Sequence, residues 1–175
     1  MKQNLLILSY DYTLSKRLSA KFADNFSMRV FDQRELFEFD HLPRSFSEVL
    51  LERGREYVFK KFKSIIKMEF DFENTVFVAD YSLADYAYDI FHNIKLANFT
   101  IYLYKNVEDE LSEVLSKDYA SNAEKEFYKI DEPLLLEREN EIKNNLADIS
   151  VDITGLNDDQ IIEVVSQKMQ NFYAK

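Results

Sequence analysis

Five short stretches rich in apolar and β-branched residues alternate along the chain with segments of helical spacing. The stretches cover residues 5–8, 28–31, 75–79, 99–104 and 149–153. The run TVFVA at 75–79 lacks polar alternation, which is typical of a strand buried on both faces of a parallel sheet. Because each strand is followed by a helical segment, the pattern predicts an α/β fold with a five-stranded, mostly parallel sheet flanked by helices.

The segments between the expected strands place apolar residues three and four positions apart. In the expected helix over residues 13–26, Leu14, Leu18 and Phe22 lie one turn apart. Further helices are expected over 33–39, 45–68, 82–94, 106–115, after Pro133, and from 157 onward. Gly54 lies inside the longest of these helices and weakens it locally.

No repeat, low-complexity segment or linker divides the sequence. We therefore expect a single domain over residues 1–175. Residues 116–133 are polar and carry several charges, and we expect them to form a loop or a shortened flap.

The charge of the chain argues against two classes of partner. It carries 32 acidic and 22 basic residues, which gives a net charge of -10 at pH 7. Because phosphate neutralisation needs clustered lysine and arginine, we expect no nucleic acid and no anionic membrane as a partner. The aromatic content of 15% is explained by a packed core, with a protein partner surface or a homodimer as the alternative.

The sequence lacks cysteine, which excludes a disulfide framework and a thiolate metal site. His41 and His92 are too few for a histidine-based metal centre. The N-terminal apolar run is shorter than a signal peptide or a spanning helix requires, so we expect a soluble, cytoplasmic protein.

Polar residues follow the ends of the expected strands, where α/β sheets bind their ligands. The first strand leads into Ser9 to Arg17, where phosphate-binding proteins carry G-x-x-x-x-G-K-[ST], and this turn contains no glycine. Lys16 still lies on the first turn of a helix whose dipole favours anions. Asp32 and Asp80 follow the second and third strands and are candidates to share a magnesium ion.

Five landmarks together resemble shikimate kinase, a small P-loop kinase of the nucleoside-monophosphate-kinase type. They are LLIL with SKRLSAKFA, VFDQRELFE, SFSEVLLERGREYVFKKF, TIYLY, and LLEREN with LADISVDITGLNDDQIIEVV. The resemblance covers nearly the whole chain and implies the three-layer sandwich of P-loop kinases. For an active member it also implies ATP and Mg²⁺ as cofactors.

The resemblance implies a role for individual positions of the phosphate loop. The family's loop glycines fall on Ser9, Tyr12 and Leu14. Its lysine falls on Ser15 or Lys16, and its magnesium-binding hydroxyl on Lys16 or Arg17. The resemblance therefore places a vestigial nucleotide site at Ser9, Lys16 and Arg17.

The resemblance also implies a substrate side of the site. The first aspartate of the family's pair is retained as Asp32, and the second, which binds substrate, is replaced by Arg34. The substrate-carboxylate arginine corresponds to Lys60, and the last substrate-contact arginine is retained as Arg138. The family's flap arginine corresponds to Glu132, and its Gly-Gly-Gly to Tyr81-Ser82-Leu83.

The leading hypothesis is a shikimate-kinase-like protein that has lost phosphoryl transfer, needs no cofactor, and serves as a binding or interaction module. Its reason is that bulky residues at Tyr12 and Leu14 prevent backbone amides from closing around a phosphate. No catalytic residue is assigned.

Two enzymatic alternatives remain open. The first is a divergent ATP-dependent small-molecule kinase that uses Lys16, Arg17, Asp32 and Asp80. The second is a haloacid-dehalogenase-like phosphatase, because LLIL-S-Y-D-Y-T-L resembles D-x-D-x-T-L. In that case Ser9 replaces the nucleophile, Asp11 is the acid/base, and Asp80 or Asp159 is a metal ligand.

Each candidate residue also has a purely structural interpretation. Asp80 is then a helix N-terminal acid near Ser82, and Asp32 an acidic turn residue. Lys16 and Arg17 belong to a solvated helix face. Arg138 pairs with a glutamate on its own helix.

Overall fold

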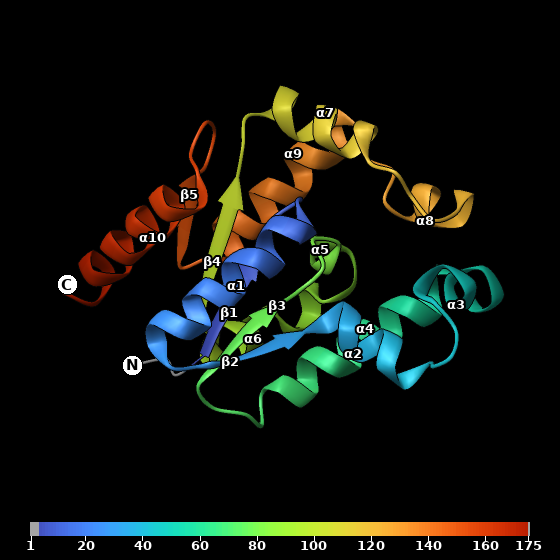
Figure 1. The fold of residues 1–175 in the computed structure, drawn as a ribbon, viewed down its shortest axis with the longest axis horizontal. Coiled ribbons are helices and arrows are strands. Elements are labelled where there is room, and N and C mark those ends of the chain that lie inside the picture. Colours follow the sequence, from blue (N-terminus) through green and yellow to red (C-terminus); the bar gives the residue numbers. More distant parts are fainter. Residues whose placement is uncertain (1–3, 175) are drawn as a thin grey trace.

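The computed structural model describes residues 4–174 and contains one five-stranded sheet (Figure 1). All neighbouring strands are parallel, and their order is β2-β3-β1-β4-β5. The strands are β1 (Asn4–Leu8), β2 (Arg29–Asp32), β3 (Thr75–Val78), β4 (Asn98–Tyr104) and β5 (Ile149–Asp152). The predicted α/β class is confirmed, and the sheet is parallel throughout.

Ten α-helices connect and flank these strands in the described part of the chain. They are α1 (Tyr12–Phe26), α2 (Gln33–Asp40), α3 (Phe46–Arg53), α4 (Arg55–Glu69), α5 (Leu83–Tyr86), α6 (Phe91–Ala97), α7 (Val107–Ser116), α8 (Asn122–Phe127), α9 (Glu132–Glu141) and α10 (Asp158–Tyr173). A 3-10 turn, η1 (Tyr88–Ile90), precedes α6, and a π-turn, η2 (Ile142–Leu146), extends α9.

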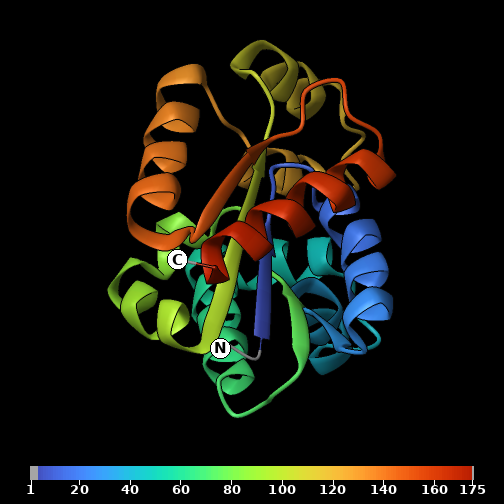
Figure 2. The same cartoon turned by 90° about the vertical axis from the view of Figure 1, so that its left-hand side faces the viewer.

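Side chains alternate along each strand and supply two apolar cores, one on each face of the sheet. Leu5 and Ile7 of β1 pack with α1 and α10, through residues such as Leu18. Leu6 and Leu8 pack on the opposite face, against α4 and α9 among others. Figure 2 shows α1 and α10 on one side of the strands and α6 and α9 on the other. The molecule therefore has three layers, as the resemblance implied.

The predicted long helix over 45–68 is divided into α3 and α4 at Gly54. Gly54 has φ +80° and ψ 170°, a conformation that L side chains rarely adopt, and it serves as both the C-cap of α3 and the N-cap of α4. Ser45 begins α3 with a capping box to Glu48; the sequence pattern left Ser45 and Ser47 as alternative caps. The apolar periodicity continued past the glycine and concealed this break.

Two other predicted segments differ from the structure. The helical stripe that begins at Ser82 is divided into α5, η1 and α6, and the Ser82 side chain makes no capping bond to α5. The segment 116–133, expected as a loop or shortened flap, contains the short helix α8, and α9 already begins at Glu132. The Ser121 hydroxyl caps α8 by accepting from the Glu124 amide.

Within the described residues, 4–174, no helix has the length and apolar character needed to span a bilayer.

Candidate functional site

A cavity of about 350 Å³ lies at the carboxyl edge of the sheet. Tyrosines from the turn after β1, the first residue of α1, the loop after β3 and the 116–133 segment form much of its lining, namely Tyr10, Tyr12, Tyr81, Tyr119 and Tyr128. The charged side chains that line it are Arg34, Asp80, Lys117, Asp118 and Glu124. The cavity is therefore aromatic, with charges of both signs.

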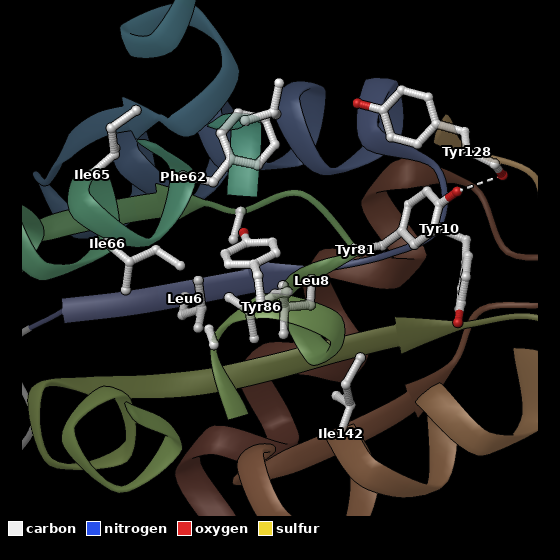
Figure 3. Packing of buried hydrophobic residues seen from close by; sticks show 14 of the residues in the cluster. Leu6, Leu8, Tyr10, Phe62, Ile65, Ile66, Tyr81, Tyr86, Tyr128 and Ile142 are labelled. Atoms are coloured by element: carbon white, nitrogen blue, oxygen red, sulfur yellow. Dashed lines mark hydrogen bonds between the residues drawn. The ribbon is translucent and has the colours of Figure 1, made fainter. Parts of the chain in front are cut away.

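Three of the lining tyrosines are buried and pack against one another with tilted rings. The ring of Tyr10 lies 4.6 Å from that of Tyr81, and Tyr81 lies 5.6 Å from Tyr128, measured between ring centroids. The Tyr81 hydroxyl donates to the carbonyl oxygen of Tyr128 at 3.0 Å, as Figure 3 shows. Burial raises the pKa of all three hydroxyls, so these side chains are neutral at physiological pH.

The connection from β1 to α1 consists of three residues, Ser9, Tyr10 and Asp11. Asp11 is the N-cap of α1, and its carboxylate accepts from the Leu14 amide at 3.2 Å. The Asp11 amide donates to the Ser9 hydroxyl at 3.1 Å, and the Ser15 amide donates to the Asp11 carbonyl at 3.0 Å. Several amides at this helix start are therefore already used within the turn.

No residue of this turn has a left-handed backbone. Among the residues that the structure describes, positive φ occurs at Ser27, Asn74, Gly54 and Gly155 alone. One form of concave anion-binding nest alternates right- and left-handed residues. The β1–α1 connection does not have that geometry.

Asp32 and Asp80 both lie at the carboxyl edge, and both are buried. One Asp32 oxygen accepts from the amides of Arg34 and Glu35, each at 3.0 Å, and from the Tyr12 hydroxyl. Burial raises the pKa of Tyr12, and its bond to Asp32 adds to this shift. Asp32 thus caps α2 and anchors Tyr12 across the turn.

Both oxygens of Asp80 have hydrogen-bond donors. One accepts from the Ser82 amide at 2.9 Å and from the Ser82 hydroxyl at 2.5 Å, and the other accepts from the Tyr128 hydroxyl at 2.8 Å. Through these bonds Asp80 joins the loop after β3 to the 116–133 segment.

Among the described residues, no group of three or more histidine, cysteine, aspartate or glutamate side chains could hold a metal ion.

The cationic ends of Lys16 and Arg17 lie against acidic partners outside the cavity. Lys16 pairs with Glu35 of α2 at 2.5 Å, and Arg17 makes a two-bond contact with Asp158 of α10 at 2.7 and 2.9 Å. Their hydrogen bonds to these partners raise the pKa of both groups. These exposed pairs hold α1 against its neighbours.

Two further residues of the phosphatase alternative have structural partners. Asp11 caps α1, as described above. Asp159 is exposed and pairs with Lys21 at 2.8 Å. Lys21 lies two to three helical turns along α1 from Asp11, so Asp159 is remote from Asp11.

Of the three candidate substrate-binding residues, Arg34, Lys60 and Arg138, only Arg34 lines the cavity. Its guanidinium donates to Glu124 at 2.5 Å and to Glu38 at 3.4 Å. It also lies 4.5 Å above the ring of Phe46, which fixes its plane.

Lys60 and Arg138 lie away from the cavity lining. Lys60 is on the exposed face of α4. Arg138 on α9 is buried and forms two bonds with Asp85 of α5, which Arg55 also contacts at 2.9 Å. The expected partner on its own helix was wrong, because α5 packs against α9 and brings Asp85 to the guanidinium.

Sequence reasoning missed the lining residues Lys117 and Glu124. Lys117 donates to the carbonyl oxygen of Tyr10 at 3.1 Å, and Glu124 contacts Arg34. Both belong to a polar segment in which no periodicity or motif marks a site residue. Only the folding of that segment across the sheet edge brings them to the cavity.

No protein-family model and no curated protein sequence matches the chain. Solved structures do match. Shikimate kinase from Bacteroides thetaiotaomicron is 15% identical over 98% of both chains, with a TM-score of 0.71. Shikimate kinase from Aquifex aeolicus is 14% identical over 96% of both chains, with a TM-score of 0.77. Deoxyadenosine kinase from M. mycoides with bound dATP is 16% identical over 95% of this chain and 99% of its own, with a TM-score of 0.59. At these identities the likeness shows the architecture alone, and the chain shares the fold of the shikimate kinases.

Proposed function

We propose that this protein has lost phosphoryl transfer and acts as a binding module that holds a small molecule in the aromatic cavity. The observation that carries the proposal is the connection of three residues between β1 and α1, which has no glycine and no left-handed residue. A triphosphate needs inward-pointing amides from such a loop, and the amides of Asp11, Leu14 and Ser15 already have partners here.

The charged groups around the turn also support the loss of transfer. Phosphoryl transfer depends on free cations and a held metal ion that neutralise the developing charge. Lys16 and Arg17 are paired with acidic residues, and both Asp80 oxygens accept hydrogen bonds. As they are paired here, Lys16, Arg17 and Asp80 therefore offer ATP with Mg²⁺ neither a free cation nor a free metal-binding oxygen.

The cavity supports a binding role. Small-molecule sites are concave and mostly apolar, with a few polar groups that orient the ligand. The tyrosine-lined cavity of about 350 Å³ has this character, with Arg34 and Lys117 as its cations.

A coupled assay for ADP and for phosphorylated product tests the proposal. Purified protein with Mg-ATP and shikimate is expected to give no transfer above background, while an active shikimate kinase serves as the positive control. Transfer that exceeds background and disappears in the Lys16→Ala variant would overturn the proposal.

A divergent small-molecule kinase is the second candidate. It is favoured by the likeness to a deoxyadenosine kinase solved with dATP, and by Lys117, a cation that the 116–133 segment places in the cavity. This candidate predicts that Mg-ATP raises the melting temperature through ligand linkage. An unchanged melting temperature at millimolar Mg-ATP would remove it.

A further inference from the structure

The stretch 115–126 is attached to the body of the protein mainly by polar contacts. Glu124 is its one buried residue, whereas Val114 and Phe127 on either side are buried apolar anchors. Tyr119 is half-buried and packs its ring on Tyr128 at 6.0 Å. A stretch with so little buried apolar surface opens more easily than the core, so its polar attachments decide its position.

Glu124 makes the central attachment. Its Oε1 accepts from Arg34 at 2.5 Å, and its Oε2 accepts from the Ser47 hydroxyl at 2.8 Å and from the Ala120 amide at 3.2 Å. Arg34 and Ser47 belong to α2 and α3, outside the stretch. Figure 1 shows α8, which carries Glu124, beside α3. The contact thus ties the 115–126 stretch to α2 and α3 at the wall of the cavity.

Arg34 also has contacts that do not involve Glu124. Stacking on Phe46 at 4.5 Å and the Glu38 contact at 3.4 Å both come from outside the 115–126 stretch. A planar guanidinium that is held in this way, beside a hydroxyl, recognises a carboxylate or a phosphate.

We propose that Arg34 and Ser47 form an anion subsite, which the Glu124 carboxylate fills in this structure. A small ligand that bears a carboxylate or a phosphate displaces Glu124, occupies the subsite and releases the 115–126 stretch. The inference rests on the proposed function, because it assigns a ligand class to the same cavity. The neutral part of the ligand would lie among the tyrosines of the cavity, and Lys117 is a second cation that the ligand can contact.

Glu124→Gln tests this subsite, with inorganic phosphate as the probe. The substitution keeps the side-chain shape and removes the charge that competes for Arg34. The matched control is Glu126→Gln on the same helix, because Glu126 is exposed and pairs with Lys129 alone among the partners that the structure records.

Phosphate is expected to bind E124Q about tenfold more tightly than it binds the unaltered protein, as measured by calorimetry, and E126Q is expected to bind like the unaltered protein. Adding Arg34→Gln to E124Q is expected to abolish the gain. An equal gain in E126Q, or binding that survives the loss of Arg34, would overturn the proposal.

Limited trypsin digestion supplies a second readout, which needs no variant. Lys117 and Lys125 are cleavage sites within the stretch. Phosphate is expected to accelerate cleavage at these two sites in the unaltered protein, and benzoate distinguishes a carboxylate source from a phosphate source. If neither anion changes this cleavage, Glu124 is not displaced and the proposal fails. Failure here leaves the phosphoryl-transfer assay unaffected, so the two proposals fail separately.

Discussion

At the scale of single residues, Glu110 on α7 shows how burial changes a carboxyl group. It is buried, and its carboxylate accepts from the Lys105 amide at 2.8 Å. Burial raises its pKa to about 7, against the lowering effect of the Lys105 amide, and the charges of Glu113 and Glu139 add to the rise. The folded protein therefore retains a proton that the unfolded chain releases near pH 4.5.

This shift makes the stability of the fold depend on pH. Between pH 4.5 and 7 the folded state binds more protons than the unfolded state, so the free energy of unfolding falls as pH rises through this range. Glu110→Gln removes the titration and keeps the acceptor for Lys105. From pH 5 to pH 8, we expect the free energy of unfolding to fall by about 2 kcal/mol less in the variant than in the unaltered protein. Urea titrations at the two pH values measure this difference.

Glu108→Gln is the control for Glu110, because Glu108 is exposed on the same helix and is not among the charges that shift the pKa of Glu110. It is expected to follow the pH dependence of the unaltered protein. Equal pH dependence in E110Q and the unaltered protein would contradict a raised pKa at this position.

The buried pair between Arg138 and Asp85 supports a second prediction. Asp85→Asn leaves the Arg138 guanidinium buried without an opposite charge, which costs roughly 3–5 kcal/mol. Arg55→Gln removes only the partly exposed partner of Asp85 and is expected to cost about 1 kcal/mol or less. Urea midpoints measure both, and equal losses would show that Arg138 does not depend on Asp85.

The sequence placed Asp32 and Asp80 at the sheet edge, because each directly follows a strand. It did not reveal their partners. Tyr12 reaches Asp32 from α1, and Tyr128 reaches Asp80 from a segment that local patterns describe only as polar. The residues of each pair are far apart in the sequence, and they meet because of how helices and loops pack on the sheet. Local sequence patterns carry no signal for such packing.

At the scale of elements, apolar runs located all five strands and gave no warning of where helices break. Parallel strands buried on both faces carry a strong local signal. Gly54 was expected only to weaken one long helix, and the break was missed because apolar spacing continues on both sides. Its positive φ shows why glycine stands there: an L side chain would be strained at this position.

Gly54→Ala is expected to destabilise the fold by about 1–3 kcal/mol, because the cost is confined to the backbone. An added Cβ meets nothing within 4 Å, so packing contributes no further loss. Gly155→Ala has the same features at φ +73° and serves as the parallel case. Lys60→Ala on the exposed face of α4 is the neutral control, expected within about 0.5 kcal/mol.

Urea unfolding monitored by circular dichroism measures all three variants. If G54A proves as stable as the unaltered protein, the division between α3 and α4 is not held by this glycine.

At the scale of the whole molecule, stability is unevenly distributed. The central strands lie between two apolar cores, whereas the 115–126 stretch has one buried residue, the polar Glu124. The alternation of strands and helices was enough to predict this sheet. The attachment of the stretch at the wall of the cavity was not predictable, because it rests on Arg34 and Ser47, which are remote from Glu124 in the sequence.

Hydrogen exchange measured by mass spectrometry is expected to show this difference. Amides of β1 and β4 should exchange only through global unfolding, and amides of 115–126 roughly a hundredfold faster or more, through local opening. Similar protection in the two regions would contradict a stretch held mainly by one carboxylate.

The position of β1 between β3 and β4 has a consequence for synthesis of the chain. β1 leaves the ribosome before either neighbour exists, and a nascent chain that ends before Thr75 offers its apolar strand no partner in the sheet. Until both neighbours have been made, that strand is exposed to chaperones and to other nascent chains. During translation, the central strand β1 is thus the strand that remains longest without both of its neighbours.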